Sequence, residues 1–122
     1  MKNILLACAF LIGSAAVSSA QSATPSSRLG WDQGAPTLAD ANGYTYKSFA
    51  DGVAPGVVLT GVTCAGTTSP YACVVNFPAF TPGSHTIQIS AANIAGESLP
   101  SAPFSFVFVV TPAVPANLRL VP

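Results

Sequence analysis

The stretch His85-Thr86-Ile87-Gln88-Ile89-Ser90 alternates polar and apolar side chains with a period of two. This alternation is typical of a β-strand that turns one face to the core and the other to solvent. Similar short runs lie at residues 28–32, 44–49, 57–64, 71–77 and 104–110. Turn residues such as Asp51-Gly52 and Pro82-Gly83 separate them. Short strands spaced by turns predict an all-β fold, either an antiparallel sandwich or a barrel.

The order of several short motifs resembles a fibronectin type III domain over about residues 27–110. Phe80-Thr81-Pro82-Gly83 is similar to that family's apolar-x-Pro-Gly corner, and Ala91-Ala92-Asn93 to the end of the strand that follows it. Leu29-Gly30-Trp31 resembles the family's Leu-x-Trp strand, and Tyr44-Thr45-Tyr46 resembles its third strand. The resemblance implies an antiparallel two-sheet sandwich, fibronectin type III or immunoglobulin-like, which we expect over residues 21–111. It also implies a spacer or binding module without chemistry of its own.

Two positions depart from the family pattern. The family's corner usually carries a tyrosine, and His85 stands there instead. We expect its ring to make a polar corner contact, with Trp31 in the core as the other structural residue. Only residues 21–27 precede the Trp31 strand, which predicts that the place of the first strand is vacant. Residues 112–122 resemble such an opening strand: they are either the stub of a neighbouring repeat or a segment that fills the vacant place, in this chain or in a second one.

The composition excludes several classes of protein. The chain has 122 residues, with 4 Lys and Arg, 4 Asp and Glu, and a formal net charge of zero, so it lacks the basic surface that nucleic acid or anionic lipid requires. Half of the residues are hydrophobic and only 7% are charged, which argues against intrinsic disorder. The length leaves room for one small domain and excludes a multi-domain enzyme.

Residues 1–20 have the pattern of a secretory signal peptide. Lys2 is followed by an apolar run from Ile4 to Ile12, and Ser18 and Ala20 form a small-x-small cleavage site. The run is too short for a membrane span, which needs about 20 residues. Cys8 resembles the cysteine of a lipoprotein signal, but too few apolar residues precede it. We expect cleavage after Ala20 and a secreted or periplasmic protein; the short signal and the lack of Asn-x-Ser/Thr sites fit a bacterial source.

Export leaves two cysteines, Cys64 and Cys73, in an oxidising compartment, where a disulfide is the expected state. The residues between them are turn formers, so the bridge is expected to close the mouth of a β-hairpin. A redox or metal pair is the alternative. The spacing is not Cys-x-x-Cys, however, and the single histidine cannot complete a zinc site. We expect no metal and no cofactor.

Few residues of the chain suit catalysis. His85 is the first candidate for a general base, and Asp32, Asp40 or Asp51 could orient it. No Gly-x-Ser-x-Gly elbow is present, and a histidine at a strand start is more often structural. Asp40-Ala41-Asn42-Gly43 is similar to the opening of a calcium loop, but Phe49 stands where that loop needs a carboxylate. We therefore interpret Asp40 and Asn42 as turn residues.

Aromatic residues are the remaining candidates for binding. Tyr44 and Tyr46 lie on one face of a strand, so both face a ligand such as a sugar or both face the core. The run Phe104 to Val110 is apolar on both faces, which predicts either a covered strand or an exposed patch that favours association.

These observations favour a secreted, non-enzymatic interaction or spacer module that associates with another protein. Self-association through residues 112–122 is one form of this function. The alternative is a glycan-binding module that uses Tyr44 and Tyr46, and a remote alternative is a small hydrolase centred on His85. We expect no nucleic-acid partner and no membrane span.

Overall fold

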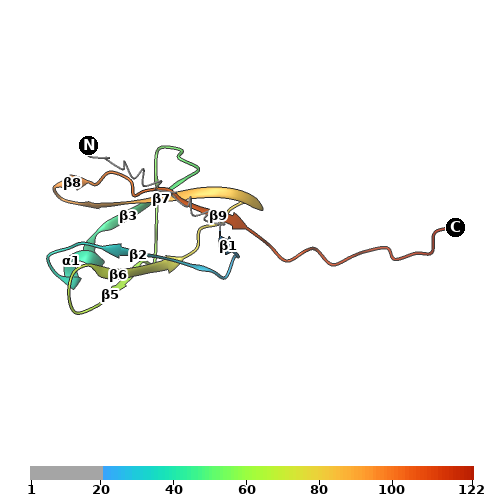
Figure 1. Ribbon diagram of the computed structural model, residues 1–122, viewed down its shortest axis with the longest axis horizontal. Helices are drawn as coiled ribbons and strands as arrows, with labels where there is room; N and C mark the ends of the chain where they lie inside the picture. The colour runs from blue at the N-terminus through green and yellow to red at the C-terminus, as the bar shows by residue number, and fades with distance from the viewer. Residues whose placement is uncertain (1–20) are drawn as a thin grey trace, which may run out of the picture.

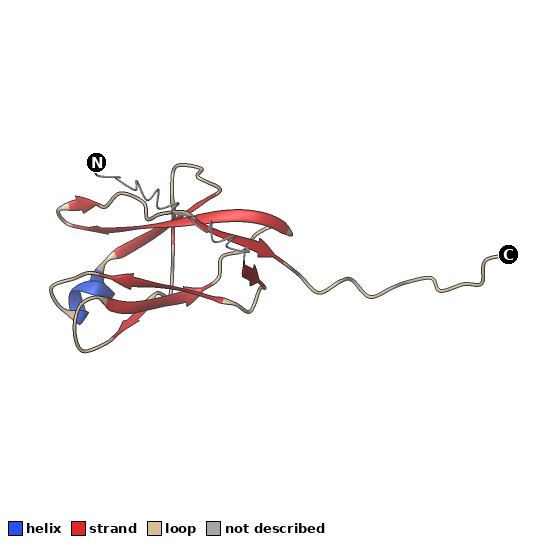
Figure 2. Cartoon of the chain, in the orientation of Figure 1, coloured by secondary structure: helices blue, strands red, loops and turns tan. Residues whose placement is uncertain are grey.

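In the described part of the chain, nine strands form two facing sheets, and one short helix lies outside both sheets (Figures 1 and 2). The computed structural model describes residues 21–122, so the predicted signal peptide and Cys8 lie outside the described residues. The elements are β1 (Gln21–Ala23), β2 (Arg28–Gln33), α1 (Leu38–Gly43), β3 (Thr45–Ala50), β4 (Val57–Val58), β5 (Thr63–Ala65), β6 (Tyr71–Asn76), β7 (Gly83–Asn93), β8 (Gly96–Glu97) and β9 (Phe104–Phe108).

The two sheets confirm the predicted all-β sandwich. One sheet has the strand order β1-β9-β7-β3-β4, with β8 paired to β7, and the other has the order β2-β6-β5. Every pairing is antiparallel except that of β1 with β9. The long strand β7 pairs with both β3 and β9, so the strand that contains the alternating stretch 85–90 is central to its sheet.

The sequence predicted a vacant place for the first strand, and this prediction is wrong in part. Gln21–Ala23 form β1, which lies parallel to the second half of β9 with Gln21 opposite Phe106. The Val109 N–H then donates to the Ala23 carbonyl at 2.8 Å. Residues 112–122 form no strand in this chain and extend away from the sandwich (Figure 1).

The space between the sheets is filled by alternate side chains of the strands. Ile87 and Phe106 are 2% and 1% exposed, and they come from the neighbouring strands β7 and β9. Leu29 and Val75 face them from the other sheet. The Phe77 ring packs edge-on against Phe106, with ring centroids 4.9 Å apart. The period-two pattern therefore marks the buried face correctly.

A second buried cluster surrounds the disulfide between Cys64 and Cys73. The two cysteines lie directly opposite each other on β5 and β6, which confirms the predicted bridge across a hairpin. Tyr46 is 2% exposed beside them, and its hydroxyl donates to the Ala41 carbonyl at 2.6 Å. Trp31 packs against both clusters and contacts Tyr46 edge-on, with ring centroids 5.2 Å apart.

The residues that we interpreted as a turn before β3 form the short helix α1 instead. Thr37 caps it, because its hydroxyl oxygen accepts from the Asp40 N–H at 3.1 Å. Asn42 then joins the helix to β5: its Oδ1 accepts from the Cys64 N–H at 2.8 Å, and its Nδ2 donates to the Cys64 carbonyl at 3.1 Å. The side chain of Asn42 thus pairs with a strand edge as a backbone amide would.

Replacing both cysteines by serine should lower the free energy of unfolding by roughly 2–4 kcal/mol, because the unfolded chain loses a short closed loop. Urea denaturation followed by tryptophan fluorescence measures this change. The wild-type protein treated with dithiothreitol is the control and should lose a similar amount. A double variant as stable as the oxidised wild type would contradict a stabilising role for the bridge.

Candidate functional sites

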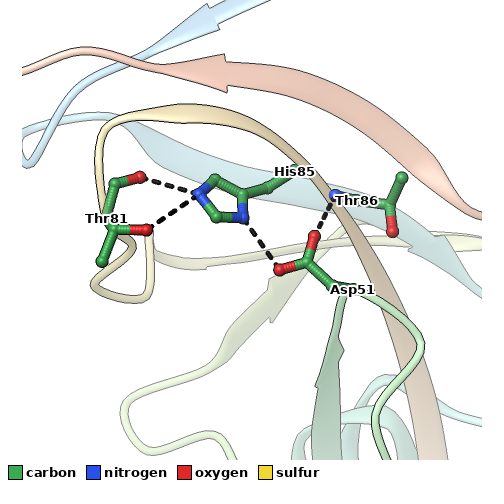
Figure 3. Close-up of polar contacts among 4 residues, drawn as sticks. All are labelled: Asp51, Thr81, His85 and Thr86. Atoms are coloured by element: carbon green, nitrogen blue, oxygen red, sulfur yellow. Dashed lines mark hydrogen bonds and ion pairs between the residues drawn. The ribbon is translucent and has the colours of Figure 1, made fainter.

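His85, near the start of β7, is held at both ring nitrogens (Figure 3). Its Nδ1 lies 2.8 Å from Oδ2 of Asp51, and its Nε2 lies 2.7 Å from the carbonyl oxygen of Thr81. The Thr81 hydroxyl is 3.2 Å from the same Nε2. The polar corner contact predicted for His85 is therefore confirmed. Of the three aspartates proposed to orient it, Asp51 is the one that does.

The turn after β3 positions Asp51. Asp51 and Gly52 both have positive φ, 52° and 71°, and the Val53 N–H donates to the Ala50 carbonyl at 3.0 Å. This is the backbone that Asp-Gly favours in a tight turn. The Asp51 backbone N–H donates to the Thr86 carbonyl at 2.8 Å, and its Oδ1 accepts from the Thr86 N–H at 2.9 Å. Asp51 thus ends the β3–β7 ladder and presents its second oxygen to His85.

The electrostatics of the corner favour a charged pair. The hydrogen bond to Asp51, followed by that to the Thr81 carbonyl, raises the pKa of His85 above its ordinary value. The backbone N–H of Thr86, followed by the His85 ring, lowers the pKa of Asp51. Both ring nitrogens face oxygens that accept, which suits the doubly protonated imidazolium.

This arrangement is better suited to bracing a corner than to proton abstraction. A general base needs a ring nitrogen that is free to take a proton from its substrate. The Nε2 that the Thr81 hydroxyl approaches is already bonded to a carbonyl, which keeps a proton on that nitrogen. Neither His85 nor Asp51 lines the groove or the hollow described below.

The two tyrosines proposed as ligand contacts differ in exposure. Tyr46 is buried, so it is not available for stacking on a ligand, and burial followed by the nearby Tyr44 raises the pKa of its hydroxyl. Tyr44 precedes β3 and is half-buried. The two rings share a face, as predicted: Tyr44 packs against the buried cluster that contains Tyr46, with ring centroids 6.3 Å apart.

Tyr44 lines a shallow hollow of about 350 Å³ with Gln33 and residues of the β7–β8 hairpin. Glu97 of β8 also lines it. The Ser90 hydroxyl donates to Glu97 Oε1 at 2.6 Å, and Lys47 Nζ lies 3.5 Å from Oε2. The hydrogen bond from Ser90, followed by the charge of Lys47, lowers the pKa of Glu97. No sequence motif indicates the group of Lys47, Ser90 and Glu97, because its members come from three separate segments.

A larger groove of about 570 Å³ opens between β2 and β9. We call it the β2–β9 groove, and its large apolar side chains include Leu29, Trp31, Ile87, Ile89, Phe104 and Phe106. Phe104 is 40% exposed, unlike Phe106 and Phe108, because β1 pairs only with Phe106 to Phe108. The indole Nε1 of Trp31 is buried and has no hydrogen-bond partner among the described residues.

Within residues 21–122 no group of three or more His, Cys, Asp or Glu side chains could hold a metal ion. The same part of the chain contains no helix of the length and apolarity that a membrane crossing requires.

Comparison of the chain with known protein families, with curated proteins and with solved structures finds no match. The arguments about function therefore rest on the sequence and on the geometry described above.

The stability of the corner should depend on pH in a defined window. Because the pKa of His85 is raised, its contribution to the free energy of unfolding is complete below its ordinary pKa of 6.5. That contribution is lost as the pH rises through the raised pKa. Because the pKa of Asp51 is lowered, its contribution is present above 3.8 and is lost as the pH falls through the lowered value. The Tm of the wild type should therefore rise as the pH is lowered from about 8 to about 6.

His85→Gln should remove this rise, as calorimetry over the same pH range would measure. Asp51→Asn removes the other charge of the pair, while its amide oxygen can still accept from the Thr86 N–H. It should also flatten the profile. A profile that keeps its slope in both variants would assign the pH dependence to other groups.

Proposed function

We propose that this chain is an exported, non-enzymatic association module that binds another protein at the cell envelope or outside the cell. One observation carries the proposal. We call residues 112–122 the C-terminal segment; its large apolar side chains lie outside the sandwich, with Val114, Leu118, Leu120 and Val121 between 78% and 99% exposed. A run of apolar side chains in water marks a surface that a partner covers.

The disulfide and the sequence of residues 1–20 support the location. A disulfide such as the one that joins β5 to β6 forms and persists in an oxidising compartment. The N-terminal pattern is that of a secretory signal peptide. The sheet order supports the fold relationship: β2, β6 and β5 in one sheet and β3, β7 and β9 in the other correspond to the two sheets of an immunoglobulin-like sandwich. The fibronectin type III resemblance belongs with this proposal.

Glycan binding is the second candidate, and the hollow beside Tyr44 favours it. An aromatic ring next to a carboxylate and side-chain amides is a combination that sugars can use for stacking and hydrogen bonding. Titration of polysaccharide fragments against the wild type and Tyr44→Ala tests it. Binding that survives the loss of Tyr44 would exclude this hollow as the site.

Removing the C-terminal segment should abolish association and leave the sandwich folded. Every residue from 112 to 122 is exposed, and their one side-chain hydrogen bond, from Arg119 Nη1 to the Asn117 carbonyl, is internal to the segment. A chain that ends at Thr111 therefore keeps each described contact of the sandwich. Sedimentation velocity over a range of concentrations should show oligomers for the full chain and a monomer for the shortened one. Monomers in both cases would contradict self-association.

A further inference from the structure

β2 is an edge strand of its sheet, and it is longer than the edge strands β1, β4 and β5. One side of β2 has no partner strand within residues 21–122. On the paired side, the Phe77 N–H donates to the Ser27 carbonyl at 3.0 Å. In an antiparallel ladder the residues alternate, so Leu29 and Trp31 continue the bonding to β6. The N–H and C=O groups of Arg28, Gly30 and Asp32 therefore point to the free edge. An unpaired edge of this kind is a template for another strand.

The β2–β9 groove lies beside that free edge. It stays open because β9 begins only after Pro103 and because β1 covers only the second half of β9. Leu29 and Trp31 form its β2 side, and Phe104 and Ile89 line it from the other sheet. A strand added to β2 would thus meet backbone groups at the edge and apolar side chains beneath it.

The C-terminal segment has the pattern that such a strand requires. Its even-numbered positions from Val114 to Leu120 are all apolar, whereas Asn117 and Arg119 are polar. In an extended chain these positions point to opposite faces. The stretch from Ala116 to Val121 has the same length as β2. When Leu118 and Leu120 point into the groove, Arg119 lies on the outer face, the same face that carries Arg28 and Asp32 of β2.

The direction of the strands indicates that the segment comes from a second copy. β9 and β2 run in opposite directions, and the segment continues outward from the end of β9 (Figure 1). To reach its own β2 it would have to reverse and run parallel to it. The turn between β1 and β2 lies on that path, because Thr24, Pro25 and Ser26 line a hollow together with residues 109–111, and the Val109 N–H is bonded to the Ala23 carbonyl. A second copy can enter from the Gln33 end and pair antiparallel.

We propose that the C-terminal segment of one copy adds as an antiparallel strand to the free edge of β2 in another, with Leu118 and Leu120 in the β2–β9 groove. This inference rests on the proposed association function and names its interface. The contact is head-to-tail: each copy offers one edge and one segment, so association forms chains or rings.

A complementation experiment tests the pairing. Gly30→Pro removes a free-edge N–H without touching a bond to β6, and proline is tolerated at such positions. This variant keeps the donor segment, whereas a chain that ends at Thr111 keeps the acceptor edge. Each should be a monomer alone, and an equimolar mixture should form a one-to-one dimer by sedimentation. Gly30→Ala is the control and should associate like the wild type, since an added Cβ would lie 3.6 Å from its nearest neighbours.

Substitutions on the two faces of the segment test its orientation. Leu118→Asp and Leu120→Asp should each weaken association by roughly tenfold or more, because each places a charge in the groove. Val121→Asp is the matched control on the opposite face and should leave association nearly unchanged. Equal losses at Leu120 and Val121 would overturn strand addition while the association function stands. No association of the wild-type chain itself would remove both.

Hydrogen exchange gives an independent test that does not require Gly30→Pro to fold. Amides of Arg28, Gly30 and Asp32 should exchange freely in the chain that ends at Thr111. They should become protected when a synthetic peptide of residues 110–122 is added. Protection of these amides before the peptide is added would show that another segment already covers the edge, and this result would falsify the proposal.

Discussion

The packing of β7 and β9 against the other sheet is the interaction on which the rest of the structure depends. Ile87 and Phe106 occupy the middle of the interface and are almost wholly buried. Burying side chains of this size stabilises a fold by roughly 1.5–3 kcal/mol each relative to leaving them in water. The register of β7 follows from this packing, because a slip of one residue would turn every apolar side chain of the strand to solvent.

The disulfide region extends the same core by different means. A small domain has a limited apolar area to bury, and here a covalent bond joins β5 to β6 where β5 is only three residues long. The Tyr46 hydroxyl and the Asn42 amide satisfy backbone groups of α1 and β5 at the edge of this cluster. These two contacts fix the position of the helix against β3 and β5.

The association proposal follows from what the core leaves uncovered. β1 is short and pairs with β9, so it does not pair with β2 as an opening strand could. The uncovered edge of β2 and the exposed apolar residues of the C-terminal segment are therefore two consequences of one arrangement. We propose that the two features pair with each other in different copies, since one offers unpaired backbone groups and the other offers apolar area in water.

The sequence by itself determined the all-β class, the buried face of the alternating strands, the Asp51-Gly52 turn and the pairing of Cys64 with Cys73, since all of these follow from local pattern or simple counting. The tertiary structure alone decided that Asp51 rather than Asp32 or Asp40 meets His85, that Tyr46 is buried, and that β1 pairs with β9. These depend on which strands become neighbours and in what register. That choice is made by packing between segments far apart in the chain, and a short run of residues carries little information about it.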